Sequence, residues 1–242
     1  MSPITVTPSA GPVIAAAGTR EGGGALSRAG RRRRWIEMGV LFVLAPLAMR
    51  WIVHDGKIPM FAALLPVLVV ALFLLLADPT FRLRTELARR IGWRNGISIL
   101  LLLVVAGGGL VAWIESHHPA WLLEFPRNRP DTYTRIMIGY PIFSVMAQEL
   151  LYRSFFFHRY GMLFGRQVWV AVAVNGLLFG FAHIVMDSTF AVVATVIGGL
   201  VLGARYAATR SFWAVFLEHT LWGWLLFTIG IGRYFFTGVS NL

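Results

Sequence analysis

The chain has 242 residues, of which 57% are hydrophobic and only 14% are charged, and its mean hydropathy is +0.68. Soluble globular domains carry about 25% charged residues, so this composition excludes a soluble domain with an ordinary water-facing surface. The absence of Cys excludes disulfides, thiolate metal sites, a cysteine nucleophile and a lipid-modified cysteine.

The chain is strongly basic, with 22 Lys and Arg against 11 Asp and Glu. In a soluble protein a pI of 11.3 would suggest a nucleic-acid partner. In a membrane protein the same excess marks cytoplasmic segments, because Lys and Arg are enriched on that side. We therefore expect the lipid bilayer as a partner and no nucleic acid.

The N-terminal segment 1–34 is rich in Gly, Ala, Pro and Ser and ends in four consecutive arginines, which predicts a disordered basic tail. A cleaved signal peptide also has cations before an apolar stretch, but this tail is long for one. The apolar segment that follows has Trp35 and Trp51 at its ends, as membrane spans do. We therefore expect the first apolar helix to be retained.

Seven apolar runs follow the tail and predict an all-α bundle that crosses the cell membrane several times. A helix needs about 20 residues to cross a hydrocarbon core of about 30 Å. The predicted spans cover residues 35–53, 59–77, 97–114, 135–160, 168–186, 189–207 and 212–229. Between them we expect a short amphipathic cytoplasmic helix in 78–95 and a Pro-rich outer loop in 115–134.

The distribution of cations predicts the topology. If the tail is cytoplasmic, 16 of the 22 Lys and Arg residues fall on inner segments, as the positive-inside rule requires. Seven spans then put the C-terminus outside. No internal repeat is visible, which disfavours a transporter built from inverted repeats.

Ionisable side chains inside the spans are the informative positions, because a charge at mid-bilayer costs about 2.5 kcal/mol or more. Glu149 and Arg153 are four residues apart in the fourth span, so they share a helix face and can pair. This spacing fits a purely structural ion pair as well as a functional one.

Two histidines lie in later spans. His183 follows Gly180 and Ala182, small residues that allow another helix to approach closely, and alone it fits a packing role. His219 follows Glu218, and because adjacent helical residues diverge by about 100°, one of the two faces inward while the other supports it. We expect no chemistry from the other histidines, His54, His117, His118 and His158.

Glu149, His183 and His219 together supply one carboxylate and two imidazoles from three helices. A carboxylate beside a histidine can deprotonate a water for attack on a peptide carbonyl, without a cofactor. Two histidines and a carboxylate are also a zinc-ligand set that leaves a position for water. The residues alone leave both chemistries open.

The order Gln-Glu-x-x-x-Arg, Phe-x-x-x-His and a late membrane-embedded His resembles the CPBP family of intramembrane proteases. The family comprises type II CAAX prenyl endopeptidases and bacterial bacteriocin-processing or immunity proteins, with the motifs E-E-x-x-x-R, F-x-x-x-H and H-x-x-x-N. The resemblance covers about residues 134–229 and implies a protease core in 131–242, preceded by N-terminal transmembrane helices in 35–130.

The resemblance assigns a role to each matching residue. It implies that Glu149 with His183 activates water and that His219 holds the oxyanion or the leaving group. It also implies that Arg153 orients Glu149, and that Phe179 belongs to the second motif.

Two positions depart from the family pattern. Gln148 stands where the family has the glutamate usually cast as the base, and a glutamine cannot accept a proton at neutral pH. Gly223 stands where an Asn would help to hold the oxyanion. Either Glu149 has taken over the base role, helped by a kink at Pro141, or the chain binds without cutting.

The resemblance implies an intramembrane endopeptidase that acts on membrane-anchored or hydrophobic peptides. One alternative is a catalytically silent immunity, chaperone or assembly protein, in which the histidines only pack. The other is a zinc-dependent intramembrane protease with Glu149, His183 and His219 as ligands. In each case we expect the supporting residues to be Gln148, Arg153, Phe179, Glu218 and Gly223.

Overall fold

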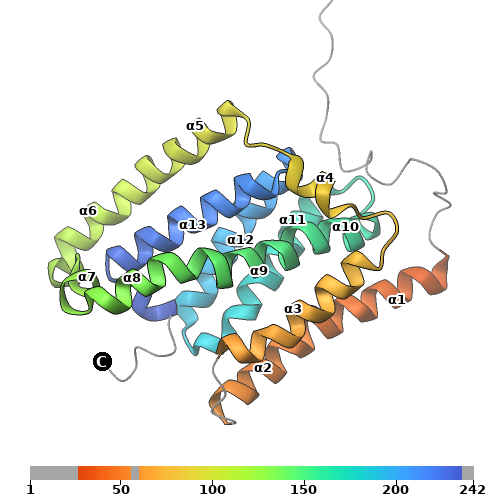
Figure 1. Ribbon diagram of the computed structural model, residues 1–242, viewed down its shortest axis with the longest axis horizontal. Coiled ribbons are helices and arrows are strands. Elements are labelled where there is room, and N and C mark those ends of the chain that lie inside the picture. The colour runs from red at the N-terminus through yellow and green to blue at the C-terminus, as the bar shows by residue number, and fades with distance from the viewer. Residues whose placement is uncertain (1–26, 56–59, 236–242) are drawn as a thin grey trace, which may run out of the picture.

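The computed structural model describes residues 27–55 and 60–235 (Figure 1). Within these ranges every regular element is a helix, and no strand occurs. The predicted all-α bundle is therefore confirmed.

The helices follow the apolar runs of the sequence. The N-terminal elements are α1 (Arg28–Gly39), η2 (Val40–Leu44), α2 (Ala45–His54), α3 (Met60–Leu76), α4 (Leu83–Ala88), α5 (Trp93–Leu102), η3 (Leu103–Gly107), α6 (Gly108–His117), η4 (Pro119–Trp121) and α7 (Glu124–Asn128). The later elements are α8 (Pro130–Gly139), η5 (Tyr140–Val145), α9 (Met146–Glu149), η6 (Leu150–Phe155), α10 (Phe156–Tyr160), η7 (Gly161–Leu163), α11 (Val168–Ala182), η8 (His183–Met186), α12 (Thr189–Thr209), α13 (Phe212–Thr228) and η9 (Ile231–Phe235).

Four continuous helical segments are long and apolar enough to cross a membrane. They are Arg28–His54 (α1, η2 and α2), Trp93–His117 (α5, η3 and α6), Val168–Met186 (α11 and η8) and Thr189–Thr209 (α12). α3 and α13 have 17 residues each, slightly short of the usual span of about 20 residues. The chain is a multi-pass membrane protein. The count of seven spans and the sides of the two termini stay predictions.

α1 begins at Arg28, so the predicted end of the disordered tail at residue 34 is wrong. Ser27 caps the helix, because its Oγ accepts a hydrogen bond from Gly30 N at 3.1 Å. Arg34 then donates to the carbonyl oxygen of Arg159 at 2.5 Å. The cap and this contact with α10 stabilise the first turns of α1, which contain the four consecutive arginines that composition alone assigned to the tail. The rest of the predicted tail, residues 1–26, lies outside the described residues.

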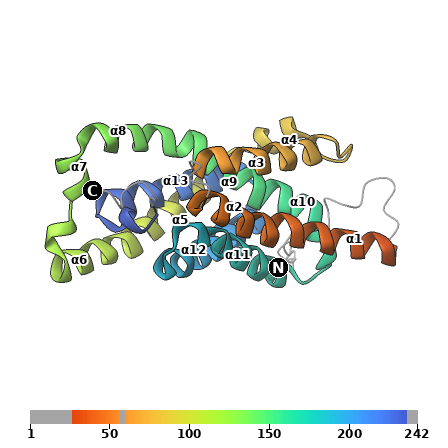
Figure 2. The ribbon, with the colours of Figure 1, turned by 90° about the horizontal axis from the view of Figure 1, so that it is seen from below.

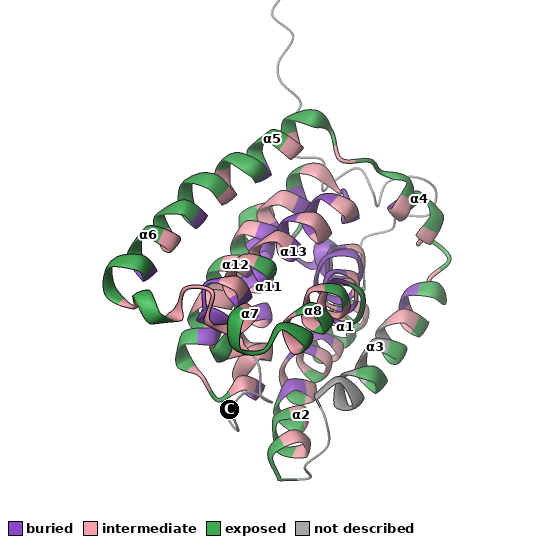
Figure 3. Cartoon of the chain, turned by 60° about the vertical axis from the view of Figure 1, so that its left-hand side comes forward, coloured by how far each residue is buried: buried purple, intermediate pink, exposed green. Residues whose placement is uncertain are grey.

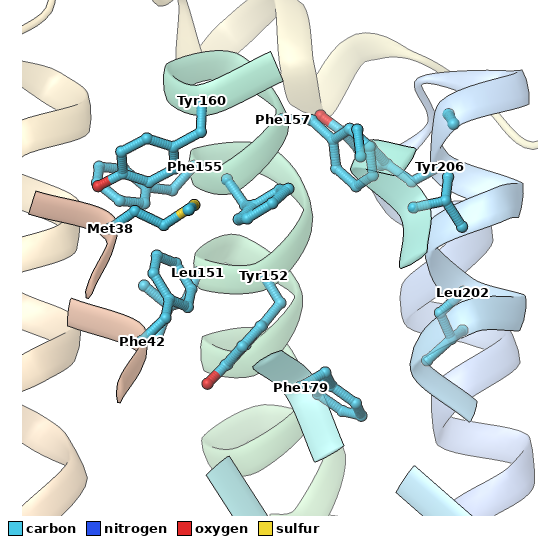
Figure 4. Packing of buried hydrophobic residues seen from close by; sticks show 14 of the residues in the cluster. Met38, Phe42, Leu151, Tyr152, Phe155, Phe157, Tyr160, Phe179, Leu202 and Tyr206 are labelled. Atoms are coloured by element: carbon cyan, nitrogen blue, oxygen red, sulfur yellow. The ribbon is translucent and has the colours of Figure 1, made fainter. Parts of the chain in front are cut away.

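Large apolar side chains cover the outside of the bundle, where exposed residues dominate (Figure 3). Val105, Phe143 and Trp169 are 65%, 69% and 72% exposed. Such a surface is unfavourable in water and suits contact with lipid. The interior of the bundle contains a cluster of buried aromatic side chains, in which Phe42 packs edge to face on Tyr152 with ring centroids 5.1 Å apart (Figure 4).

The C-terminal helices pack closely around α13, which lies between α8 and α12 in the view of Figure 2. α11 and α12 approach backbone to backbone. A Cβ built on Gly199 would lie 2.9 Å from Cα of Gly176, and one built on Gly180 would lie 2.9 Å from N of Val196. The close approach expected at Gly180 is therefore present, and it fixes the end of α11 that carries His183.

Candidate functional site

A cavity of about 1040 Å³ lies among the helices. Its wall is mostly apolar and includes Phe143, which is exposed, so the cavity reaches the lipid-facing surface. Its polar lining includes the side chains of Tyr140, Ser144, Gln148, His183 and His219. An apolar pocket with a few convergent polar groups is the usual form of a small-molecule or peptide site.

Glu149 and His219 form the central contact of the site. Glu149 on α9 is completely buried, and its Oε1 lies 2.7 Å from Nδ1 of His219 on α13. A carboxylate only accepts, so Nδ1 carries the hydrogen, and in the neutral imidazole Nε2 of His219 keeps its lone pair. His219 lines the cavity, whereas Glu149 lies behind it.

Arg153 balances the buried carboxylate. Its Nε lies 3.2 Å from Oε2 of Glu149, and neither side chain has any exposure. The predicted ion pair is therefore present, although these two atoms are not aligned as a hydrogen bond. The guanidinium instead donates through Nη1 to Oδ1 of Asn175, and it lies 4.9 Å from the ring centroid of Phe179.

His183 enters the cavity from the turn after α11. Its Nδ1 lies 2.8 Å from the carbonyl oxygen of Phe179, so this nitrogen donates, and in the neutral imidazole Nε2 keeps its lone pair. The ring of Phe179 packs against both imidazoles, at centroid distances of 4.9 Å to His183 and 5.7 Å to His219. The carboxylate of Glu149 thus bonds His219, and the shared role of Glu149 and His183 in activating water stays a prediction.

The supporting residues divide into two groups. Gln148 lines the cavity and donates from Nε2 to Oγ of Ser144 at 2.7 Å, while its buried Oε1 has no partner among the described residues. Glu218 points away from the site: it is buried and accepts two hydrogen bonds from Arg205 of α12. Glu218 therefore holds α13 on α12 and does not contact His219.

Gly223 lies in the wall of the cavity against Tyr140. A Cβ built on Gly223 would lie 2.6 Å from Cζ and 2.7 Å from Oη of that ring. The Tyr140 ring, which belongs to η5, therefore occupies the position that a Cβ at residue 223 would need.

Sequence reasoning missed two residues of the site, Asn175 and Tyr140. The signal for Asn175 is a single Asn in an otherwise apolar span, and because its side chain is not ionisable the cost of burying a charge does not single it out. Tyr140 gave no signal, because its contact with Gly223 joins positions far apart in the chain.

No group of three His, Asp or Glu residues arranged to hold a metal ion occurs within 27–55 and 60–235. The oxygens of Glu149 face His219 and Arg153. Zinc dependence stays a prediction.

Residues 130–225 match the family model of the type II CAAX prenyl endopeptidase Rce1-like proteins. Comparison of the chain with curated proteins and with solved structures gave no match. The family match includes all three motifs, from Gln148 to His219, and confirms the resemblance to the CPBP family.

Proposed function

From this resemblance to the CPBP family, we propose that the chain is an intramembrane endopeptidase that hydrolyses membrane-anchored or hydrophobic peptides. The observation that carries the proposal is the 2.7 Å contact between Glu149 Oε1 and His219 Nδ1. It leaves Nε2 of His219 free to act as a base at the wall of an apolar cavity.

In the proposed reaction, a water gives one proton to Nε2 of His219 while its oxygen attacks the peptide carbonyl carbon. Glu149 stays ionised beside Arg153 and stabilises the imidazolium that forms, as a buried carboxylate does in hydrolytic triads. When the tetrahedral intermediate collapses, the C–N bond breaks and the imidazolium proton passes to the leaving nitrogen. The water oxygen and its second proton remain in the new carboxyl group.

His183 presents a second lone pair to the same cavity. A water that donates one hydrogen bond to His219 Nε2 and another to His183 Nε2 has its oxygen lone pairs directed at the substrate. In this proposal Glu149 acts through His219, and His183 positions the water.

The form of the cavity supports a substrate that arrives from the bilayer. Ile142 and Phe143 are in its wall and are 55% and 69% exposed. A peptide held by a lipid anchor or an apolar segment can therefore enter from the side of the bundle without leaving the membrane.

The test uses purified protein in liposomes with two probes, a farnesylated peptide and the same peptide without the lipid, and mass spectrometry of the products. Glu149→Gln, His183→Gln and His219→Gln are each expected to lower turnover by about 100-fold or more, because loss of a general base or its partner costs this much. Glu115→Gln and His117→Gln, which change an exposed carboxylate and an exposed histidine at the end of α6, are the matched controls. Full turnover by the site variants contradicts the proposal.

A catalytically silent protein is the second candidate, and the position of Gln148 favours it. This side chain, and not Glu149, lines the cavity. If a glutamate at 148 is the missing base, Gln148→Glu will raise cleavage by about 100-fold or more. If His219 is the base, the same variant will change turnover only a few-fold. A chelator titration in the same assay tests the zinc alternative.

A further inference from the structure

Tyr140 is the residue that faces α13 at the catalytic end of the cavity. Its ring packs on His219 and Phe227 at centroid distances of 6.0 and 5.5 Å. Gly223 lies between these two residues, so all three share one face of α13 at intervals of four residues. Because position 223 has no side chain, the hydroxyl edge of Tyr140 can lie against the helix backbone.

The proposed reaction also needs a hydrogen-bond donor for the carbonyl oxygen. Both imidazoles use Nδ1–H on protein acceptors, so both Nε2 atoms are acceptors until a proton arrives. One N–H of the Gln148 amide donates to Oγ of Ser144, and the other N–H has no partner among the described residues. Tyr140 also belongs to the cavity wall, and its hydroxyl, which lies against Gly223, has no hydrogen bond among the described residues.

We propose that the hydroxyl of Tyr140 is the catalytic donor that stabilises the oxyanion. This inference rests on the proposed function. As water attacks, the carbonyl oxygen gains negative charge and accepts a hydrogen bond from Oη of Tyr140. The bond is released when the C–N bond breaks and the carbonyl reforms. Gly223 is then the residue that makes room for this donor.

The first test is Tyr140→Phe, which keeps the ring and its packing and removes the donor. Loss of one oxyanion donor typically lowers kcat by about 100- to 1000-fold, and we expect KM to change less than threefold. The matched control is Tyr133→Phe on α8, whose hydroxyl lies 2.9 Å from Thr228 Oγ1 and whose side chain is not part of the cavity wall. The control is expected to keep the wild-type kcat.

The second test replaces the donor from the opposite helix. Tyr140→Ala vacates the space over Gly223, and in that background Gly223→Asn supplies an amide while Gly223→Leu supplies the same volume without a donor. We expect the Asn double variant to turn over at least tenfold faster than the Leu double variant.

Each outcome decides the question. A wild-type kcat in Tyr140→Phe overturns the role of Tyr140, and equal rates for the Asn and Leu double variants overturn the inference that Gly223 makes room for a donor to the oxyanion. If Glu149→Gln is inactive in the same assay, the proposed function survives that result. A wild-type chain that cleaves neither peptide overturns both.

Discussion

Asn175 connects α11 to the buried arginine of the neighbouring helix. Its Oδ1 accepts a hydrogen bond from Arg153, and its Nδ2 donates to the carbonyl oxygen of Tyr152 at 2.7 Å. Asn175 and Arg153 have no exposure. An uncharged amide thus supplies an acceptor to a guanidinium whose Nε and Nη2 have no aligned hydrogen bond among the described residues.

We predict that Asn175→Leu, which keeps the volume and removes both polar atoms, lowers the free energy of unfolding by about 2 kcal/mol, because hydrogen bonds to buried charged groups are worth about 1.5–3 kcal/mol. The measurement is SDS-induced unfolding in detergent micelles. Asn128→Ala, at the exposed end of α7, is the control and is expected to have no effect. A change at Asn175 below about 0.5 kcal/mol would mean that Arg153 is held by Glu149 alone.

The positions of the helices were predictable because the lipid-facing surface requires long apolar runs. The run 168–186 corresponds to α11 with η8, and 212–229 to α13 with one further residue. The start of α1 was not predictable, because it depends on a cap by Ser27 and on a carbonyl of α10 that binds Arg34.

The membership of the site was partly predictable, and its pairing was not. Glu149 and Arg153 are an i,i+4 pair, which sequence alone identifies. Which histidine meets Glu149 depends on the rotation of α9, and this follows the π-helical turn that begins at Tyr140 and contains Pro141. The contact of Tyr140 with Gly223 depends on how η5 and α13 pack, which no local pattern encodes.

Asp78, in the loop after α3, gives a pH-dependent prediction. Burial raises the pKa of its carboxyl, but hydrogen bonds from the hydroxyl and the backbone N–H of Thr80, at 2.6 and 2.9 Å, outweigh it and hold the pKa below its usual value. A carboxyl with a lowered pKa in the folded state stabilises the protein above its unfolded pKa, and this stabilisation is lost as pH falls through the folded value.

Asp78→Ala is therefore expected to be less stable than the wild type at pH 7 by about 1 kcal/mol, and the difference should shrink as pH falls below about 4, where the unfolded carboxyl titrates. The measurement is unfolding in micelles across this pH range. Asp131→Ala, an exposed carboxylate in the first turn of α8, serves for comparison. A difference that is independent of pH would show that the carboxylate charge contributes nothing.

The contact between α11 and α12 gives the sharpest stability prediction, because two adjacent glycines of α12 differ only in what they face. A Cβ on Gly199 would lie 2.9 Å from Cα and 3.0 Å from the carbonyl oxygen of Gly176, whereas a Cβ on Gly198 would have nothing within 4 Å. Backbone atoms cannot move aside without separating the helices.

Gly199→Ala is therefore expected to be less stable than Gly198→Ala by about 1–3 kcal/mol, the usual cost of overpacking. Both variants gain the same intrinsic helix propensity, about 1 kcal/mol, so the difference between them isolates the packing. SDS-induced unfolding of the two variants measures it, and equal stabilities would mean that α11 and α12 are not in backbone contact in the membrane.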